Sequence, residues 1–168
     1  KPLHSFANEF SKELCATSTY LPEGARKISP LDQKTLRYAV RMKDDRGFLF
    51  INNFQDHAVT RPKKDETIVL ELSGETIEVG PVSLAPDENC ILPFNMDLNG
   101  ILLKYALAQP VTRWTEGGTV CYLFMVPDGM EEGFVFEEGT VVTEGNHGYG
   151  RVYSVVREDK CCSIYTIP

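Results

Sequence analysis

The first sixteen residues carry apolar side chains at the spacing of one helix face. Leu3, Phe6, Phe10 and Leu14 recur every three or four positions, with mostly polar residues between them. This period predicts an amphipathic helix of about four turns over residues 1–16. An apolar stripe of this size rarely stays bare. We therefore expect it either to fold back onto the rest of the domain or to form a dimerising patch.

From residue 36 onward the pattern changes to that of β-strands. Residues 36–42 alternate between apolar and polar, a turn follows at 44–47, and "FLFI" is typical of a strand buried on both faces. The run 73–75 indicates a hairpin between "TIVLEL" and "TIEVG". Further strands are expected in "ILLKYALA", "VTRW", "TVCYLFMV", "GFVFE", "TVVT", "RVYSVV" and "CSIYTI", with Gln109 and Pro110 separating the first two.

Residues 36–168 are therefore expected to form an all-β domain, an antiparallel β-sandwich or barrel-like fold with one N-terminal α-helix. Between helix and strands, residues 17–35 are rich in Pro, Gly and Ser and are expected to be a linker. The sequence "KPLHSFANEF" has neither an initiating Met nor the regions of a signal peptide. We therefore expect the chain to be a piece of a longer protein.

Composition and charge narrow the range of partners. Of the 168 residues, 42% are hydrophobic and 24% charged, the net charge is −7, and Lys and Arg are scattered. Nucleic acid and an anionic membrane surface are not expected as partners, because binding either requires a basic patch. The longest uncharged apolar run, Thr119–Val126, is far shorter than the roughly 20 residues of a membrane-spanning helix.

The five cysteines, Cys15, Cys90, Cys121, Cys161 and Cys162, form no C-x-x-C pair and no repeated spacing. We expect them to be reduced and buried, since free Cys packs as a small hydrophobic residue. Cys161 and Cys162 are adjacent in an expected strand, so their side chains should point to opposite faces.

Patterns for catalytic, metal or cofactor chemistry are weak. His4, His57 and His147 lie far apart, whereas zinc needs three or four converging ligands. The segment 95–100 opens like a calcium loop, but its twelfth position is Ala106, and a tight turn explains it better. "GNHGYG" is expected to be a flexible turn, and the acidic pairs 131–132 and 137–138 to be solvated. No catalytic, cofactor-binding or metal-binding residue is predicted.

The candidates for binding are amides and aromatic residues. Asn52, Asn53, Gln55 and His57 follow the buried run "FLFI", where such side chains either hold an irregular backbone or face a neighbouring domain. Trp114, the only tryptophan, and Tyr105 have the rings needed to stack on a sugar, although an ordinary half-buried aromatic is the favoured interpretation of Trp114.

Several segments, taken in order, resemble glycoside hydrolase family 35, the β-galactosidases. "LHSFANEFSKELCATSTYLP" resembles the last helix of the catalytic barrel and its exit linker, and "LRYAVRMKDDRGFLFINNFQDH" the strand pair that opens the following domain. "ILPFNMDLNGILLKYALAQPVTRW" and "TVCYLFMVPDGMEEGFVFE" resemble later segments of that domain. The resemblance covers most of residues 3–138.

The resemblance implies a non-catalytic accessory domain. Family 35 enzymes carry their two catalytic glutamates on a (β/α)8 barrel, in motifs "I-E-N-E-Y/F" and "T-E-x-W", and neither motif occurs here. The expected partner is an upstream barrel of the same chain, whose cleft this domain would border, and the expected location is periplasmic or extracellular.

Two alternatives stay open. The first is an autonomous carbohydrate-binding module, with Trp114, Tyr105 and Tyr149 as its aromatic platform and Asn52, Asn53 and Gln55 as hydrogen-bonding amides. The second is an independent hydrolase, which predicts cleavage of an aryl β-galactoside by this chain alone.

Overall fold

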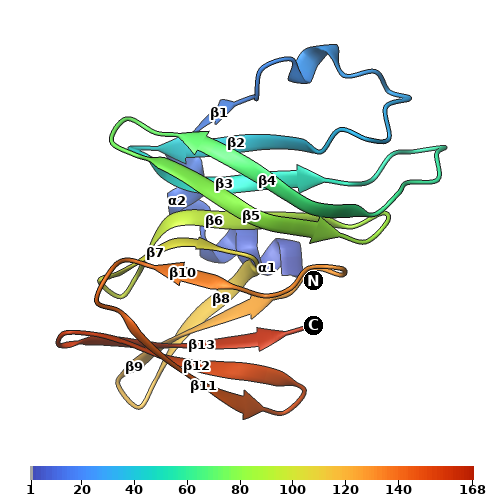
Figure 1. Cartoon of the computed structure of the whole chain (residues 1–168). Coiled ribbons are helices and arrows are strands. Elements are labelled where there is room, and N and C mark those ends of the chain that lie inside the picture. The colour runs from blue at the N-terminus through green and yellow to red at the C-terminus, as the bar shows by residue number, and fades with distance from the viewer. Residues whose placement is uncertain (1) are drawn as a thin grey trace.

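The computed structural model describes residues 2–168, so Lys1, the first residue of the expected helix, lies outside the described residues. The expected all-β, sandwich-like fold with an N-terminal helical segment is confirmed (Figure 1). The elements in chain order are α1 (Pro2–Glu9), α2 (Ser11–Cys15), β1 (Ser18–Tyr20), η1 (Ala25–Lys27), β2 (Arg37–Lys43), β3 (Arg46–Asn52), β4 (Lys63–Glu71), β5 (Thr76–Leu84), β6 (Asn89–Leu98), β7 (Ile101–Ala106), β8 (Gln109–Glu116), β9 (Thr119–Met125), β10 (Phe134–Phe136), β11 (Val141–His147), β12 (Gly150–Arg157) and β13 (Lys160–Ile167).

The strands form three sheets. A six-stranded sheet has the order β1-β2-β3-β6-β7-β10, a five-stranded sheet has the order β11-β12-β13-β9-β8, and β4 and β5 form a two-stranded ribbon. Neighbouring strands are antiparallel with one exception: β13 pairs in parallel with β9. The mostly antiparallel arrangement expected from the sequence is thus confirmed, with this one parallel pair. Within residues 2–168, no helix is long and apolar enough to cross a membrane.

The six-stranded sheet contributes to three separate cores. One face of β3 and β6, carrying Leu49 and Phe94, packs against Ile68 and Val79 of the ribbon. Figure 1 shows this ribbon crossing the sheet on the side opposite the helices. Further along, β7 packs against β9, β12 and β13 of the five-stranded sheet. β3 and β6 are buried on both faces, so their successive side chains enter cores on opposite sides of the sheet.

The N-terminal helical segment folds back onto the six-stranded sheet. Phe6 and Phe10 are 1% and 0% exposed and pack against Phe48 of β3 and Ile91 of β6. The ring of Phe6 meets that of Phe48 edge-on, with centroids 5.1 Å apart. The expected stripe is thus buried by its own domain, which confirms the fold-back alternative, although Leu3 at its end remains 56% exposed.

The single helix expected over residues 1–16 is divided at Phe10. The backbone of Phe10 has φ −103° and ψ 22°, outside the regular helical region, and α2 begins at the next residue. The N–H of Phe10 donates to Phe6 O in α1, and its carbonyl accepts the N–H of Leu14 in α2, both at 2.9 Å. The two pieces are therefore joined directly at Phe10 by hydrogen bonds to both of its backbone groups.

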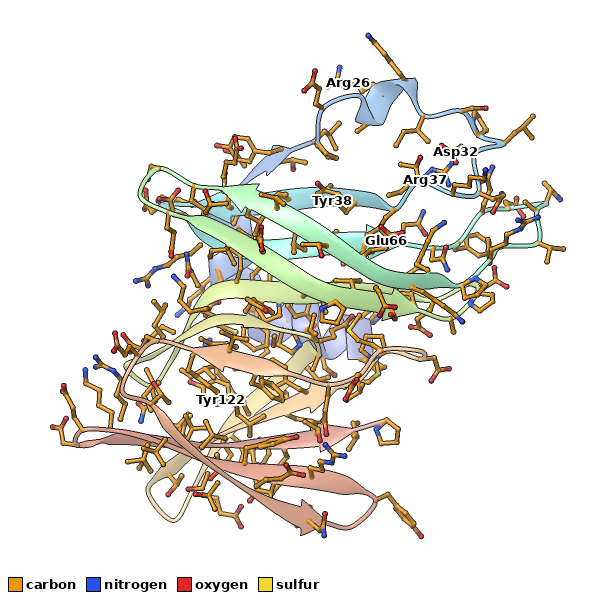
Figure 2. All side chains as sticks on the ribbon, in the orientation of Figure 1. Arg26, Asp32, Arg37, Tyr38, Glu66 and Tyr122 are labelled. Carbon is orange, nitrogen blue, oxygen red and sulfur yellow. The ribbon has the colours of Figure 1, made fainter. Side chains whose placement is uncertain are left out.

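Part of the stretch expected as a linker is ordered. β1 pairs with residues 40–42 of β2 at the edge of the six-stranded sheet. Farther on, Asp32 accepts hydrogen bonds from Lys34 N at 2.7 Å and from the Thr35 hydroxyl at 2.6 Å. The bond from the Thr35 side chain is the main cause that lowers the pKa of Asp32 to about 2. Arg37 donates to the Asp32 carbonyl at 2.9 Å, and Figure 2 shows the two side by side where this loop joins β2.

The chain leaves β7 earlier than expected. Leu107 and Ala108 separate β7 from β8, whereas Gln109 and Pro110 belong to β8. Gln109 is 4% exposed, and its Oε1 accepts the backbone N–H of Ile91 at 2.9 Å. This buried bond ties β8 to β6, a constraint that the turn-forming character of Gln-Pro does not reveal.

Three cysteines are buried and two are not. Cys90, Cys121 and Cys162 are buried, whereas Cys15 and Cys161 are exposed, so the expected burial is wrong for those two; all five are free thiols. Cys161 and Cys162 point to opposite sides of β13, as predicted from strand geometry. Burial raises the pKa of Cys90 and of Cys162 to about 12.

The docking of the helix predicts a large effect of truncating Phe10. Phe10→Ala should lower the free energy of unfolding by about 3–5 kcal/mol, because it empties a fully buried site. Phe54→Ala is the matched control, since Phe54 is 48% exposed and its loss should cost less than about 1 kcal/mol. Urea unfolding measures both. Equal small losses for the two variants would mean that the helix is not docked in solution.

Candidate functional site

The amides after β3 are used inside the fold. Asn53 is 6% exposed, and its Nδ2 donates to the carbonyls of Arg61 at 3.0 Å and Ala85 at 2.8 Å. Asn52 Oδ1 accepts the backbone N–H of Phe54 at 2.9 Å. The expected role of these side chains in holding an irregular backbone is confirmed, and it leaves the Nδ2 donors of Asn53 already engaged.

Gln55 and His57 lie on the connection between β3 and β4. Gln55 Oε1 accepts from Gln33 Nε2 at 3.1 Å and from Arg37 at 3.3 Å, so it fastens the 29–35 loop. His57 has φ +58° and its side chain is 92% exposed, with Nε2 3.3 Å from Asp56 Oδ2. His57 thus lies at the surface, apart from the hydrogen bonds made by Gln55.

Tyr105 and Trp114 face different parts of the molecule. The hydroxyl of Tyr105 donates to the carbonyl of Gly80 at 3.3 Å, and its ring packs against the core beneath the ribbon. Trp114 lies on β8 in the five-stranded sheet and is 37% exposed. The structure therefore does not bring the six candidate residues together into one site.

Trp114 instead belongs to an aromatic cluster on the outer face of the five-stranded sheet. Its ring centroid lies 5.4 Å from that of Tyr165 on β13, and His147 on β11 meets Tyr165 edge-on at 5.1 Å. These three residues, with Glu116 and Tyr149, line a groove of about 510 Å³. We call this the aromatic groove.

A second hollow lies at the same end of the sheet. It measures about 520 Å³ and is lined by Glu132, Asn146 and Arg151, among others; we call it the polar pocket. Arg151 Nη1 is 2.9 Å from Glu132 Oε1, which also accepts the Tyr153 hydroxyl at 3.0 Å. Burial, above all, raises the pKa of Tyr153, so its hydroxyl remains a donor. Glu132 is not solvated as expected, because its side chain is only 11% exposed.

The turn between β11 and β12 borders both hollows. Gly145–His147 lie in β11 and Gly150 begins β12, so the turn expected across "GNHGYG" is confined to Gly148 and Tyr149. Gly148 has φ +58°, and a Cβ on Gly150 would lie 1.7 Å from the carbonyl oxygen of Thr166. Glycine is thus required for β12 to approach β13 here, while Tyr149 at the tip is fully exposed.

The residues that sequence reasoning missed are Tyr165, Glu132 and Arg151, and it had placed His147 only within a turn. Tyr165 belongs to a segment with the alternating pattern of a strand. Nothing in the neighbouring sequence indicates that it lies beside Trp114, since β9 lies between β13 and β8 in the sheet. Glu132 belongs to a connection whose acids are ordinarily solvated. Strand alternation is the one property of the sequence that points to this pocket. It places Arg151 and Tyr153, two residues apart in β12, on the same face of the sheet.

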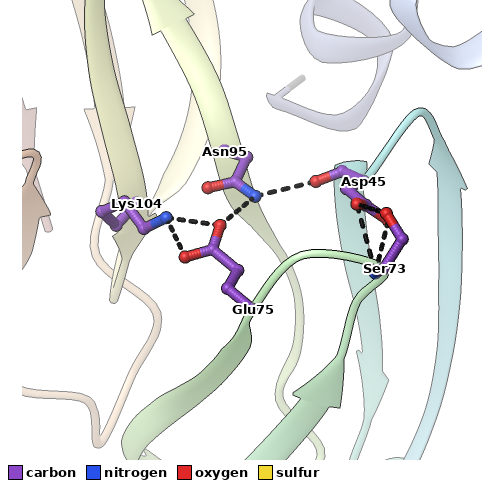
Figure 3. Close-up of polar contacts among 5 residues, drawn as sticks. All are labelled: Asp45, Ser73, Glu75, Asn95 and Lys104. Carbon is purple, nitrogen blue, oxygen red and sulfur yellow. Dashed lines mark hydrogen bonds and ion pairs between the residues drawn. The ribbon is translucent and has the colours of Figure 1, made fainter.

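The segment that opens like a calcium loop contains the expected tight turn only at Asn99 and Gly100, because residues 95–98 belong to β6. Asp97 Oδ1 accepts the N–H of Gly100 at 3.0 Å, and Asn99 has φ +55°. Asn95 donates through Nδ2 to the Asp45 carbonyl at 2.8 Å and to Glu75 Oε1 at 3.2 Å (Figure 3). Within residues 2–168, no group of three or more His, Cys, Asp or Glu side chains is placed to hold a metal ion.

Comparison with known proteins gives no family for this chain: no family model and no curated protein matches the sequence. The two hollows are therefore interpreted from their own chemistry. Aromatic faces contact the apolar faces of a ring, and a few polar side chains fix its orientation by hydrogen bonds. The aromatic groove supplies the first kind of contact and the polar pocket the second.

The polar network of Figure 3 predicts a pH-dependent contribution to stability. Lys104 Nζ lies 2.5 Å from Glu75 Oε2, and this hydrogen bonding, above all, holds the pKa of Glu75 below its ordinary value. A carboxyl with a lowered folded-state pKa stabilises the fold above its unfolded-state pKa of about 4.3, and this contribution is lost as the pH falls through the folded-state pKa.

Glu75→Gln should therefore lower the free energy of unfolding by at most about 1 kcal/mol at pH 7, because the pair is partly exposed and screened by solvent. The difference from the wild type should narrow below about pH 4. Glu78→Gln is the control, because it removes an exposed carboxyl on the same ribbon that lies outside the network of Figure 3. Urea unfolding from pH 3 to 7 measures both variants, and a difference for Glu75→Gln that stays constant with pH would contradict the assignment.

Proposed function

We propose that this chain is a non-catalytic accessory β domain of a larger glycoside hydrolase similar to the β-galactosidases of family 35, where it supports a catalytic barrel and borders its substrate cleft. The observation that carries this proposal is the docking of α1 and α2. A helix that joins the domain to an upstream unit is useful as a support only if it is held rigidly by the domain. Here it is fixed by both apolar and charged contacts.

The charged contacts come from Arg113 on β8. Its Nε lies 2.9 Å from Glu9 Oε1 and its Nη1 2.9 Å from Glu13 Oε1, so one side chain binds both α1 and α2. The same guanidinium lies over the ring of Phe10, 5.1 Å from its centroid. Any unit attached before α1 is thereby held by the six-stranded sheet through Phe6 and Phe10 and by the five-stranded sheet through Arg113.

An apolar groove lies beside the start of α1. It measures about 460 Å³ and is lined by Pro2, Leu3, Phe50, Cys90 and Met125, among others. Leu3 is 56% exposed there. A barrel joined to α1 would adjoin this groove and cover it, which fits a supporting role, because contacts between domains of one chain bury such patches.

This function predicts two results that are read separately. The coding sequence immediately upstream of Lys1 should encode a (β/α)8 barrel of roughly 250 residues with two glutamates at the ends of strands. The isolated chain should not cleave an aryl β-galactoside, since the proposed catalytic carboxylates belong to the barrel. A start codon directly upstream would overturn the accessory-domain proposal, and cleavage by the isolated chain would establish an independent hydrolase.

A second candidate function is that of an autonomous carbohydrate-binding module. It is favoured by the packing of Trp114 against Tyr165 on an open sheet face, which presents aromatic surface to solvent at the edge of a groove. Rigid aromatic side chains supply large contact area at little cost in conformational entropy. The proposed sugar-binding platform consists of Trp114, Tyr165 and His147. It differs from the one expected from the sequence, because Tyr105 and the amides near β3 are not part of it.

Trp114 is the only tryptophan, so its fluorescence reports directly on this groove. The second candidate function predicts a saturable change in fluorescence when galactosides or other neutral saccharides are titrated, and a matching heat in calorimetry. Tyr20→Ala, which removes a different exposed aromatic residue, should leave the titration unchanged. A flat titration by both methods would rule out sugar binding by the isolated domain.

A further inference from the structure

The aromatic groove and the polar pocket are neighbours. Both are lined by Gly148 and Tyr149 of the β11–β12 turn and by Gly150 at the start of β12. Thr166 and Ile167 of β13 also line both. The exposed ring of Tyr149 therefore stands at the boundary between an aromatic surface and a polar one.

The two hollows open on opposite faces of the strand pair. Asn146 and His147 are consecutive in β11, so their side chains point to opposite faces, the first toward the polar pocket and the second toward the aromatic groove. Arg151 and Tyr153 share the polar side with Asn146. A ligand that reaches both hollows must bend round the tip of the turn.

We propose that the aromatic groove and the polar pocket are two subsites for one short, neutral oligosaccharide that wraps round the β11–β12 turn. This inference rests on the second function proposed above and adds the size and charge of the ligand. One sugar unit stacks on Trp114 and Tyr165, the chain passes Tyr149, and a later unit is hydrogen-bonded in the polar pocket.

The polar pocket has the chemistry to hold a sugar. Arg151, 51% exposed, offers N–H donors, and the exposed amide of Asn146 both donates and accepts. Glu132 acts as a positioning residue, because its Oε1 anchors the Arg151 guanidinium. Its other oxygen, Oε2, is buried without a partner, and a water held beneath the sugar would supply the missing donor.

Charge decides between a neutral sugar and other ligands. Glu116, Glu131 and Glu132 line the two hollows, and Glu144 lies 3.4 Å from Arg151, so the surroundings repel an anion. Arg151, which lines the polar pocket, opposes a lysine- or arginine-rich peptide. Hydroxyl groups donate to carboxylates and accept from the guanidinium, so a neutral oligosaccharide suits this mixture of charges.

The test compares short and long saccharides by titration calorimetry on the whole chain. The probes are galactose, glucose and mannose with the matching tetrasaccharides galactotetraose, cellotetraose and mannotetraose. At least one tetrasaccharide should bind about tenfold more tightly than its monosaccharide, since the second subsite adds hydrogen bonds to a charged group. Arg151→Gln and Asn146→Ala should each reduce that ratio, while Trp114→Ala should weaken both lengths.

Arg157→Gln is the matched control. Arg157 lies at the other end of β12, paired with Glu137 at 3.5 Å and outside both hollows, so its loss should leave the ratio unchanged. Circular dichroism and urea unfolding verify that each variant is folded. If Arg151→Gln does not fold, Asn146→Ala tests the second subsite in its place.

The outcomes separate this inference from the function on which it rests. Binding that requires Trp114 but shows the same ratio in Arg151→Gln, Asn146→Ala and wild type would keep the carbohydrate function and overturn the second subsite. No binding of any of the six saccharides would overturn both. Tighter binding of an oligolysine peptide than of every tetrasaccharide would replace the sugar by a basic peptide and overturn the inference.

Discussion

The arrangement of this protein depends on the burial of Phe6 and Phe10 between two sheets. One face of the six-stranded sheet is covered by the β4–β5 ribbon, and the other is divided between the five-stranded sheet and the helical segment. Without α1 and α2, Phe48 and Ile91 would lie bare at the place where the two sheets diverge. Arg113 adds the charged contacts that hold both helical pieces against β8. The helix is therefore a structural part of the domain.

This constraint separates the molecule into a supporting side and an open side. The proposed interdomain contacts gather near α1, where Leu3 and Phe50 border an apolar groove. The outer face of the five-stranded sheet, with Trp114, Tyr165 and the β11–β12 turn, is not used to hold the helix. The two proposed functions thus use different surfaces, and an accessory domain that also binds sugar needs no residue to serve both.

Sequence reasoning succeeded where the signal is local. The alternation along 36–42, the helical stripe of Phe6 and Phe10 and the turn at Asn99–Gly100 each follow from residues close in the chain. Sequence reasoning did not predict the features that depend on contacts between residues far apart in the chain. The parallel pairing of β13 with β9, which brings Tyr165 beside Trp114, has no local signature. β1 is three residues long and forms only because β2 offers an edge, and Glu132 is buried only because Arg151 and Tyr153 approach it.

The most direct test of the account is hydrogen exchange of the backbone amides of α1 and α2 in the native chain. If the helix is part of the core, the amides of Phe10 and Leu14 open only when the whole domain unfolds. Their protection should then equal that of β3 and β6 and should fall with denaturant at the same slope. Exchange many orders of magnitude faster than in β3 and β6 would mean that the helix detaches by itself, and the rigid support proposed here would be contradicted.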